Sequence, residues 1–191
     1  MRSPLHDIVA LWIAWLLIWL ASAPFTARTA VRQPLAAFLA DRALLSGGAI
    51  LLMVHGSSVL FRPLGTGVWE RWACAAAVAA GLAFAVWARL RLGRNWSHVA
   101  VLKEDHALVR AGPYARVRHP IYSGMLLALA GTALAVATPA GLAGLALLAA
   151  GFVLRIRREE ALLLGHFGDA YRAYQAEVPA LVPRLAARGV R

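Results

Sequence analysis

Five stretches of the chain are apolar over nearly the length that a helix needs to cross a lipid bilayer. A spanning helix takes about 20 mostly apolar residues, and the chain is 61% hydrophobic and only 15% charged. A water-soluble domain of 191 residues does not carry so much apolar sequence. The pattern predicts an all-α integral membrane protein, formed as one domain over residues 1–191, with about five transmembrane helices. They are expected at residues 5–23, 44–61, 68–90, 120–137 and 140–154.

The connections between these stretches predict how some of them pack. The last two are joined by "ATPAG", which leaves room only for a tight turn, so we expect a helical hairpin. The stretch 44–61 contains Gly47, Gly48 and Ser57. Because small residues let helix backbones approach closely in a membrane, this helix is expected to pack tightly against a neighbour or to line a cavity.

Basic residues indicate the orientation of the chain, since cytoplasmic loops carry the excess of Lys and Arg. With five spans and the N-terminus outside, all 20 basic residues except Arg2, Arg62 and Arg71 fall on the cytoplasmic side. The net charge of +11 then reflects orientation and contact with membrane lipid, and no nucleic-acid partner is expected. Abundant alanine with Lys103 as the only lysine suggests a GC-rich bacterial genome. We therefore expect a bacterial inner-membrane protein with a cytoplasmic C-terminus.

Two polar segments, 91–119 and 155–191, share the cytoplasmic side, and the predicted hairpin brings them together. In the first, "HVAVLKEDHALV" at 98–109 has the pattern of two short strands around a turn. The second begins as "LRIRREEALLLGHFGDAYRAYQ", which predicts a helix that leaves the membrane. The prolines of "VPALVP" at 178–183 are expected to end that helix.

Two motifs in these segments, "HALVRAGPYARVRHPIYSG" at 106–124 and "RIRREEALLLGHFGDAYRAYQAEVPALVP" at 155–183, resemble a known family. They are similar to the isoprenylcysteine carboxyl methyltransferases and the related membrane phospholipid methyltransferases. The resemblance implies a cytoplasmic S-adenosylmethionine site built by the C-terminal half of the chain. It implies cofactor contacts at His106, Ala107, Leu108, Val109, Tyr114, His119, Pro120, Ile121, Tyr122 and Glu159, the first four through backbone atoms. It assigns Arg155 to the methyl acceptor and to catalysis.

The residues themselves agree with this assignment. S-adenosylmethionine is charged and water-soluble, so its site must face the cytoplasm, where both motifs fall. Pro120 suits the first turn of a helix, and His119 then lies beside a helix N-terminus, which favours an anionic group such as the methionine carboxylate. Arg155 and Glu159 are four residues apart and share a helix face. A simple helical ion pair, worth about 0.3–0.5 kcal/mol, is the alternative reading of these two.

Other polar residues leave alternatives open. Tyr114 and Tyr122 also fit ordinary interfacial aromatics. An ionisable residue inside a span is a functional candidate by default, so His55 is expected either to contact the acceptor or to hydrogen-bond a neighbouring helix. Glu160 is expected off the face of Arg155 and Glu159, and Arg157 and Arg158 likewise. Cys74 is the single cysteine, and no metal site is predicted.

The expected function is therefore methyl transfer from S-adenosylmethionine to a lipophilic, membrane-embedded acceptor, a carboxylate of the isoprenylcysteine type. Residues 1–90 would form three spans on the acceptor side. Residues 91–191 would supply the cofactor loop, the hairpin and the C-terminal helix. Two alternatives remain: an NADPH-dependent reductase of the sterol-reductase type, and a membrane binding protein without catalysis.

Overall fold

A computed structural model describes residues 3–22, 35–53, 58–93 and 108–184. Within these ranges the regular structure is entirely helical, which confirms the predicted all-α class. The elements are α1 (Pro4–Ser22), α2 (Leu35–Met53), η2 (Val59–Phe61), α3 (Val68–Leu92), η4 (Gly112–Ala115), α4 (Pro120–Val136), α5 (Pro139–Phe167) and α6 (Asp169–Glu177). The strand pair expected at 98–109 falls almost wholly outside the described residues and stays a prediction.

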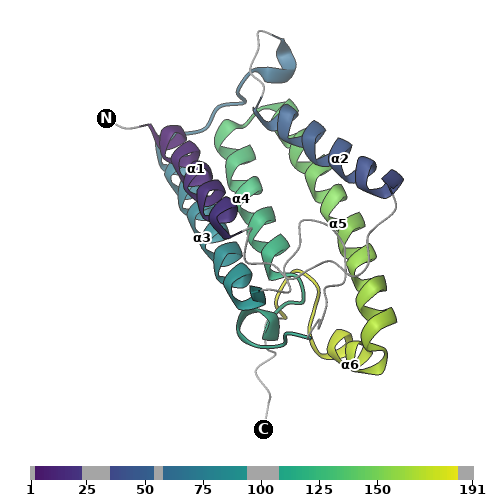
Figure 1. The fold of residues 1–191 in the computed structure, drawn as a ribbon. Helices are drawn as coiled ribbons and strands as arrows, with labels where there is room; N and C mark the ends of the chain where they lie inside the picture. The colour runs from purple at the N-terminus through teal and green to yellow at the C-terminus, as the bar shows by residue number, and fades with distance from the viewer. Residues whose placement is uncertain (1–2, 23–34, 54–57, 94–107, 185–191) are drawn as a thin grey trace.

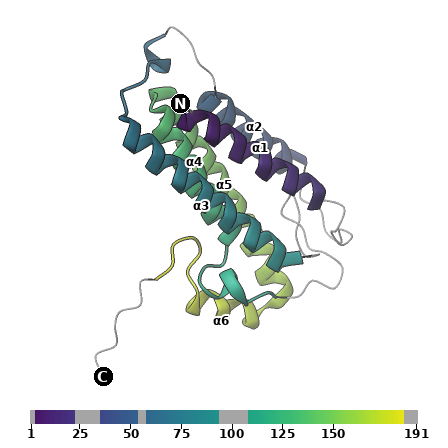
Figure 2. The same cartoon turned by 90° about the vertical axis from the view of Figure 1, so that its left-hand side faces the viewer.

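The five long helices form a bundle with α4 in the middle (Figure 1). Helix α3 packs along one side of α4, and α1 packs against α3. Helix α5 packs along the other side of α4, and α2 packs against α5. The short elements η4 and α6 lie together at one end of the bundle (Figure 2). That end also receives the start of α4 and the last turns of α5, so the two sequence motifs converge there.

Four helices, α1, α2, α3 and α5, are long and apolar enough to cross a membrane. Helix α4 is apolar but has only 17 residues, at the lower limit for a span. The outer surface is apolar as well. Trp69 and Trp87 on α3 are 84% and 38% exposed, and a rise of 1.5 Å per residue separates them by about 27 Å. This matches the spacing of interfacial aromatics across a hydrocarbon core. The protein is integral to the membrane.

Helix α2 lies earlier in the chain than the sequence pattern predicted. It covers Leu35–Met53 rather than 44–61. Residues 35–43 include Asp41 and Arg42, and a charge inside a span is costly. In the structure Asp41 is 3% exposed and its carboxylate accepts a hydrogen bond from the Arg158 guanidinium of α5. The charge is therefore paired within the bundle, and the helix can include it.

The predicted hairpin of α4 and α5 is confirmed. Ala137 ends α4 in a left-handed conformation with φ of 49°, which turns the chain sharply. Thr138 then caps α5, its hydroxyl accepting a hydrogen bond of 3.0 Å from the Gly141 amide. Because the turn is so short, α4 and α5 run antiparallel side by side, and residues near the start of α4 lie opposite residues near the end of α5.

The helix expected after residue 154 is continuous with the preceding span. Helix α5 runs 29 residues to Phe167, and Gly168, with φ of 54°, then turns the chain into α6. A glycine adopts this backbone conformation without the steric cost that a side chain adds. Helix α6 ends at Glu177, directly before the prolines of "VPALVP", as predicted.

Glycines allow the closest helix contacts in the bundle. A Cβ atom added to Gly81 of α3 or to Gly124 of α4 would overlap the backbone carbonyl of the other residue. Gly48 of α2 and Gly144 of α5 are related in the same way, which confirms the tight packing expected at Gly48. In a membrane, dispersion contacts across such close approaches supply much of the energy that holds helices together.

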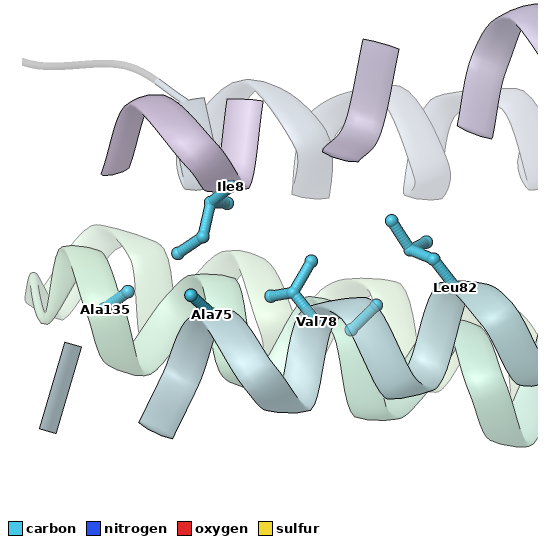
Figure 3. Packing of buried hydrophobic residues seen from close by; sticks show 6 residues of the cluster. Ile8, Ala75, Val78, Leu82 and Ala135 are labelled. Carbon is cyan, nitrogen blue, oxygen red and sulfur yellow. The ribbon is translucent and has the colours of Figure 1, made fainter. Parts of the chain in front are cut away.

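Small side chains fill the interface of α1, α3 and α4. Ile8 of α1 points toward Ala75 of α3 and Ala135 of α4, and Val78 and Leu82 follow further along α3 in the same cluster (Figure 3). A polar contact crosses the same interface, where the Trp12 indole N–H donates to the Thr132 hydroxyl at 3.0 Å.

Candidate active site

Side chains from both sequence motifs meet at the end of the bundle where η4 and α6 lie (Figure 2). Tyr122 lies in the first turn of α4, and Glu159 lies near the end of α5. The Tyr122 hydroxyl donates a hydrogen bond of 2.6 Å to Oε1 of Glu159. The Tyr122 ring also packs against the ring of Phe152, with centroids 5.2 Å apart. The hairpin thus brings together residues that the sequence separates by the length of two helices.

Arg155 lies one turn before Glu159 on the same face of α5. Its Nε is 3.6 Å from Oε1 of Glu159, and its guanidinium carbon is 5.9 Å from the centre of the Tyr122 ring. The residue is only 9% exposed. Arg155, Glu159 and Tyr122 therefore form one cluster of a buried guanidinium with a partly buried carboxylate and phenol.

His119 is the N-cap residue of α4, as expected from Pro120 at the first helical position. It is 6% exposed, and two carboxylates of α5 lie on opposite sides of its ring. Nε2 is 3.0 Å from Oε1 of Glu160, and Nδ1 is 3.7 Å from Oε2 of Glu159. The His119 ring therefore connects two consecutive glutamates, one by a hydrogen bond and one by proximity.

Glu160 belongs to this network, although sequence reasoning placed it off the functional face. Arg118 donates from Nε to Oε1 of Glu160 at 2.8 Å, and its Nη2 forms an ion pair with the same oxygen at 2.7 Å. Gln175 of α6 donates to Oε2 at 3.1 Å. The prediction considered only the face of α5 shared with Arg155. The polar residues immediately before α4 and on α6 cover the neighbouring face, and the run of two glutamates was the signal that could have revealed it.

Arg157 and Arg158 were also expected off the face of Arg155, and the structure agrees for Arg158. Its guanidinium turns to α2, where it donates to Asp41 and, at 3.3 Å, to the carbonyl of Ala37. Arg157 is exposed. Both arginines therefore lie apart from the cluster at Tyr122.

The chain after α6 folds back onto the first motif. The Arg118 amide donates to the Pro179 carbonyl at 2.8 Å, and the His119 amide donates to the Ala180 carbonyl at 3.0 Å. The Ser123 hydroxyl donates to the Leu181 carbonyl at 2.6 Å. We refer to residues 178–181 as the C-terminal strap. It fixes the backbone at the beginning of α4 by hydrogen bonds that no local sequence pattern encodes.

The other expected cofactor residues lie around this network. Tyr114 of η4 is buried, and its carbonyl accepts a hydrogen bond of 2.6 Å from the Tyr174 hydroxyl of α6. Burial raises the pKa of Tyr114 far above its usual value, so its phenol stays protonated. Leu108 packs against the cluster of Tyr171 and Tyr174.

Pro120 is buried, whereas Val109 and Ile121 are partly exposed. The structure thus gathers His119, Tyr122, Arg155 and Glu159 into one cluster and places Leu108 and Tyr114 in a second one beside α6. His55, His106 and Ala107 lie outside the described residues.

Comparison with known proteins gives consistent matches to one family. Residues 74–165 match the isoprenylcysteine carboxyl methyltransferase (ICMT) family. A relative named protein-S-isoprenylcysteine O-methyltransferase, from Schizosaccharomyces pombe, is 37% identical over 101 residues, which cover 51% of this chain and 43% of that protein. Methanethiol S-methyltransferase 2 from Bradyrhizobium diazoefficiens is 43% identical over 79 residues, covering 39% of this chain and 28% of that protein.

A solved structure has the same fold. It is described as the eukaryotic intramembrane Ras methyltransferase ICMT, and the superposition has a TM-score of 0.53 at 24% identity. The match covers 81% of this chain and 55% of the other. The chain spans about half or less of the length of the curated relatives cited above. Residues 74–165, which match the family, contain both Tyr122 and Glu159.

Proposed function

We propose that this chain, whose residues 74–165 match the isoprenylcysteine carboxyl methyltransferase family, is a membrane enzyme that transfers a methyl group from S-adenosylmethionine to a lipophilic acceptor. The observation that carries the proposal is the junction of the two motifs. The Tyr122–Glu159 hydrogen bond joins them beside His119, in a partly buried cluster at one end of the bundle.

The polar groups at this junction fit the chemistry of the cofactor. Its amino-acid and ribose parts carry N–H and O–H donors, and the Glu159 side chain, 24% exposed, offers a carboxylate acceptor. The N-terminus of α4 next to His119 favours a negative group such as the cofactor carboxylate. On this proposal Pro120, Ile121 and Tyr122 line the same site. Contacts from His106, Ala107, Leu108, Val109 and Tyr114 complete it.

The bound cofactor would supply a methyl group already activated by its sulfonium. The chain then has to align the acceptor, exclude water and stabilise charge, which supplies most of the rate in such a displacement. Arg155 is suited to grip an acceptor carboxylate through two parallel N–H donors. A carboxylate is nucleophilic at neutral pH, so no general base is required. The Tyr122 and Phe152 rings would keep water from the reacting atoms.

The location of the site supports the same proposal. The arginine-rich segments flank the motif end of the bundle, so that end faces the cytoplasm, where the cofactor is made. The N-terminus of α1 would then lie outside. We propose the bacterial inner membrane as the location, with residues 1–90 on the acceptor side and His55 as a contact for the acceptor.

The acceptor class is the part of the proposal that an experiment must decide. The curated relatives act, by their names, on isoprenylcysteine or on methanethiol. Purified protein should be incubated with methyl-labelled S-adenosylmethionine and, in separate reactions, a bacterial lipid extract, an isoprenylcysteine analogue and methanethiol. We expect labelled methyl ester in the first two. If only methanethiol becomes labelled, the acceptor is a thiol and the proposal of a carboxylate acceptor is wrong.

Ligand titration separates the proposal from its two alternatives. Calorimetry with S-adenosylhomocysteine and with NADPH, on the same preparation, should show binding of the first alone. Binding of NADPH instead would indicate a reductase. Binding of neither would indicate a membrane protein that has the fold without the catalysis.

A further inference from the structure

We infer that Glu160 is a positioning residue for the proposed reaction: it holds the His119 ring so that Nδ1 faces Glu159 and the bound cofactor. The role of the ring toward the cofactor rests on the proposed function. The orientation of the ring rests on the contacts of Glu160 alone.

Glu160 is surrounded by hydrogen-bond donors. Arg118 donates from Nε to Oε1 at 2.8 Å and pairs with it through Nη2 at 2.7 Å, and Gln175 donates to Oε2 at 3.1 Å. An ionised carboxylate only accepts hydrogen bonds. Nε2 of His119, 3.0 Å from Oε1, must therefore carry the hydrogen of that contact. In a neutral ring this leaves Nδ1 as a lone-pair acceptor.

The backbone of His119 is already fixed, so the ring orientation is the freedom that remains. The His119 amide donates to Ala180 of the C-terminal strap, and its carbonyl accepts from the Ser123 amide, both at 3.0 Å. Rotation of the ring by 180° would place carbon atoms where Nε2 and Nδ1 now lie. The hydrogen bond to Glu160 opposes that rotation, because it exists in one orientation only.

In the neutral ring, the selected orientation pairs two acceptors. Nδ1 of His119 and Oε2 of Glu159 lie 3.7 Å apart, and Oε1 of Glu159 already accepts from Tyr122. Two neighbouring acceptors bind an N–H or O–H group that can share its hydrogens between them. The ammonium group and the ribose hydroxyls of the proposed cofactor carry such donors. Loss of Glu160 would therefore weaken cofactor binding without removing any cofactor contact.

The first test is a spectroscopic signature of the ring. Protein labelled with ¹⁵N-histidine is studied by NMR in detergent without ligand, and His119→Gln assigns the signal. We expect a slowly exchanging imidazole N–H proton on Nε2 of His119 in the wild type. Glu160→Ala should abolish it and Glu160→Gln should retain it, because the amide oxygen still accepts. Glu177→Gln, an exposed glutamate on α6, is the matched control and should leave it unchanged.

The second test compares the same variants in binding of S-adenosylhomocysteine. Glu160→Ala should raise the dissociation constant about tenfold or more, as expected for loss of a buried charged hydrogen bond, and Glu160→Gln by no more than about threefold. Arg118→Ala removes the ion pair but not the histidine contact, so it should keep the N–H signal.

Several results would overturn the inference. They are a wild-type ring without the protected Nε2–H, a signal that persists in Glu160→Ala, and equal loss of affinity in the two Glu160 variants. If Glu160→Ala fails to fold, the wild-type spectrum and Glu160→Gln still decide the question. If the protein shows the protected Nε2–H but does not bind S-adenosylhomocysteine, the proposed function is wrong and the inferred ring orientation is still supported.

Discussion

Tyr122 and Glu159 are 37 residues apart in the chain, and a hydrogen bond of 2.6 Å joins the phenol of one to the carboxylate of the other. This bond holds the Glu159 side chain against α4. We expect Tyr122→Phe, which keeps the ring against Phe152, to weaken S-adenosylhomocysteine binding by about 1–3 kcal/mol. Tyr122→Ala and His119→Ala should each weaken it by at least that much. Calorimetry measures all three.

A double-mutant cycle tests whether the two residues act together. Glu159→Gln alone and the combination with Tyr122→Phe complete the cycle, and we expect a coupling of about 0.5–3 kcal/mol in ligand binding. Additive losses would mean that the tyrosine and the glutamate contribute separately and that the hydrogen bond has no part in binding.

Arg155 and Glu159 share a helix face but are expected to serve different ligands. Glu159→Ala should raise the dissociation constant of the cofactor. Arg155→Ala should leave that constant within a few-fold and lower turnover by roughly 10²-fold or more through lost alignment of the acceptor. Calorimetry and initial rates with the acceptor found above measure the two effects. If Arg155→Ala keeps full turnover, or loses the cofactor as severely as Glu159→Ala, the two residues are a structural ion pair.

The contact of Gly81 with Gly124 makes a prediction about stability. Gly81→Val places methyl groups where the α4 backbone lies, so we expect a lower thermal unfolding temperature in detergent, equivalent to at least about 1–3 kcal/mol. Gly165→Ala is the control, since a Cβ there meets no atom within 4 Å. In a helix interior this exchange should be neutral or stabilising by up to about 1 kcal/mol. Similar melting of wild type and Gly81→Val would contradict the close approach.

The pair of Asp41 and Arg158 predicts an asymmetric response to mutation. Arg158→Ala leaves a buried carboxylate without its charged partner and should cost about 3–5 kcal/mol of unfolding free energy. Replacement of both residues by leucine should cost clearly less, because the exposed hydrophobic surface of the bundle already favours apolar side chains. Denaturant unfolding of the two variants checks this. If the double variant is as unstable as Arg158→Ala, the loss of unfolding free energy comes from altered packing and not from the unpaired carboxylate.

The orientation is tested by reporters fused to the chain ends. One placed before Met1 should read periplasmic, and one placed after Arg191 should read cytoplasmic. The same compartment for both would mean an even number of spans, with α4, the short 17-residue helix, as the first to reconsider.

Sequence patterns predicted those parts of the fold that depend on neighbouring residues. Apolar length located α1, α3, α4 and α5, and the turn at Thr138 brought two distant motifs together. The start of α2 was missed, and the charge of Asp41 within it is paired by Arg158, a residue of another helix. Periodicity along one helix cannot reveal a contact made across helices.

The same reason explains what the sequence revealed of the site. Arg155 and Glu159 were paired correctly because they are four residues apart in one helix. Glu160 was set aside because Arg118 and Gln175, which surround it, come from other elements. The strap was missed altogether, since its backbone hydrogen bonds leave no mark on the choice of side chains.

The strap also sets an order of events during biosynthesis. The backbone amides of Arg118 and His119 form hydrogen bonds with carbonyls about 60 residues further along the chain. At a translation rate of about 5–20 residues per second, the ribosome adds those residues several seconds after the beginning of α4. A nascent chain stalled at the end of α5 would already contain the histidine and both glutamates but would lack the carbonyls that fix the histidine backbone. The hydrogen-bonded backbone at His119, on which the proposed cofactor site depends, is therefore completed late in translation, after the membrane helices have been synthesised.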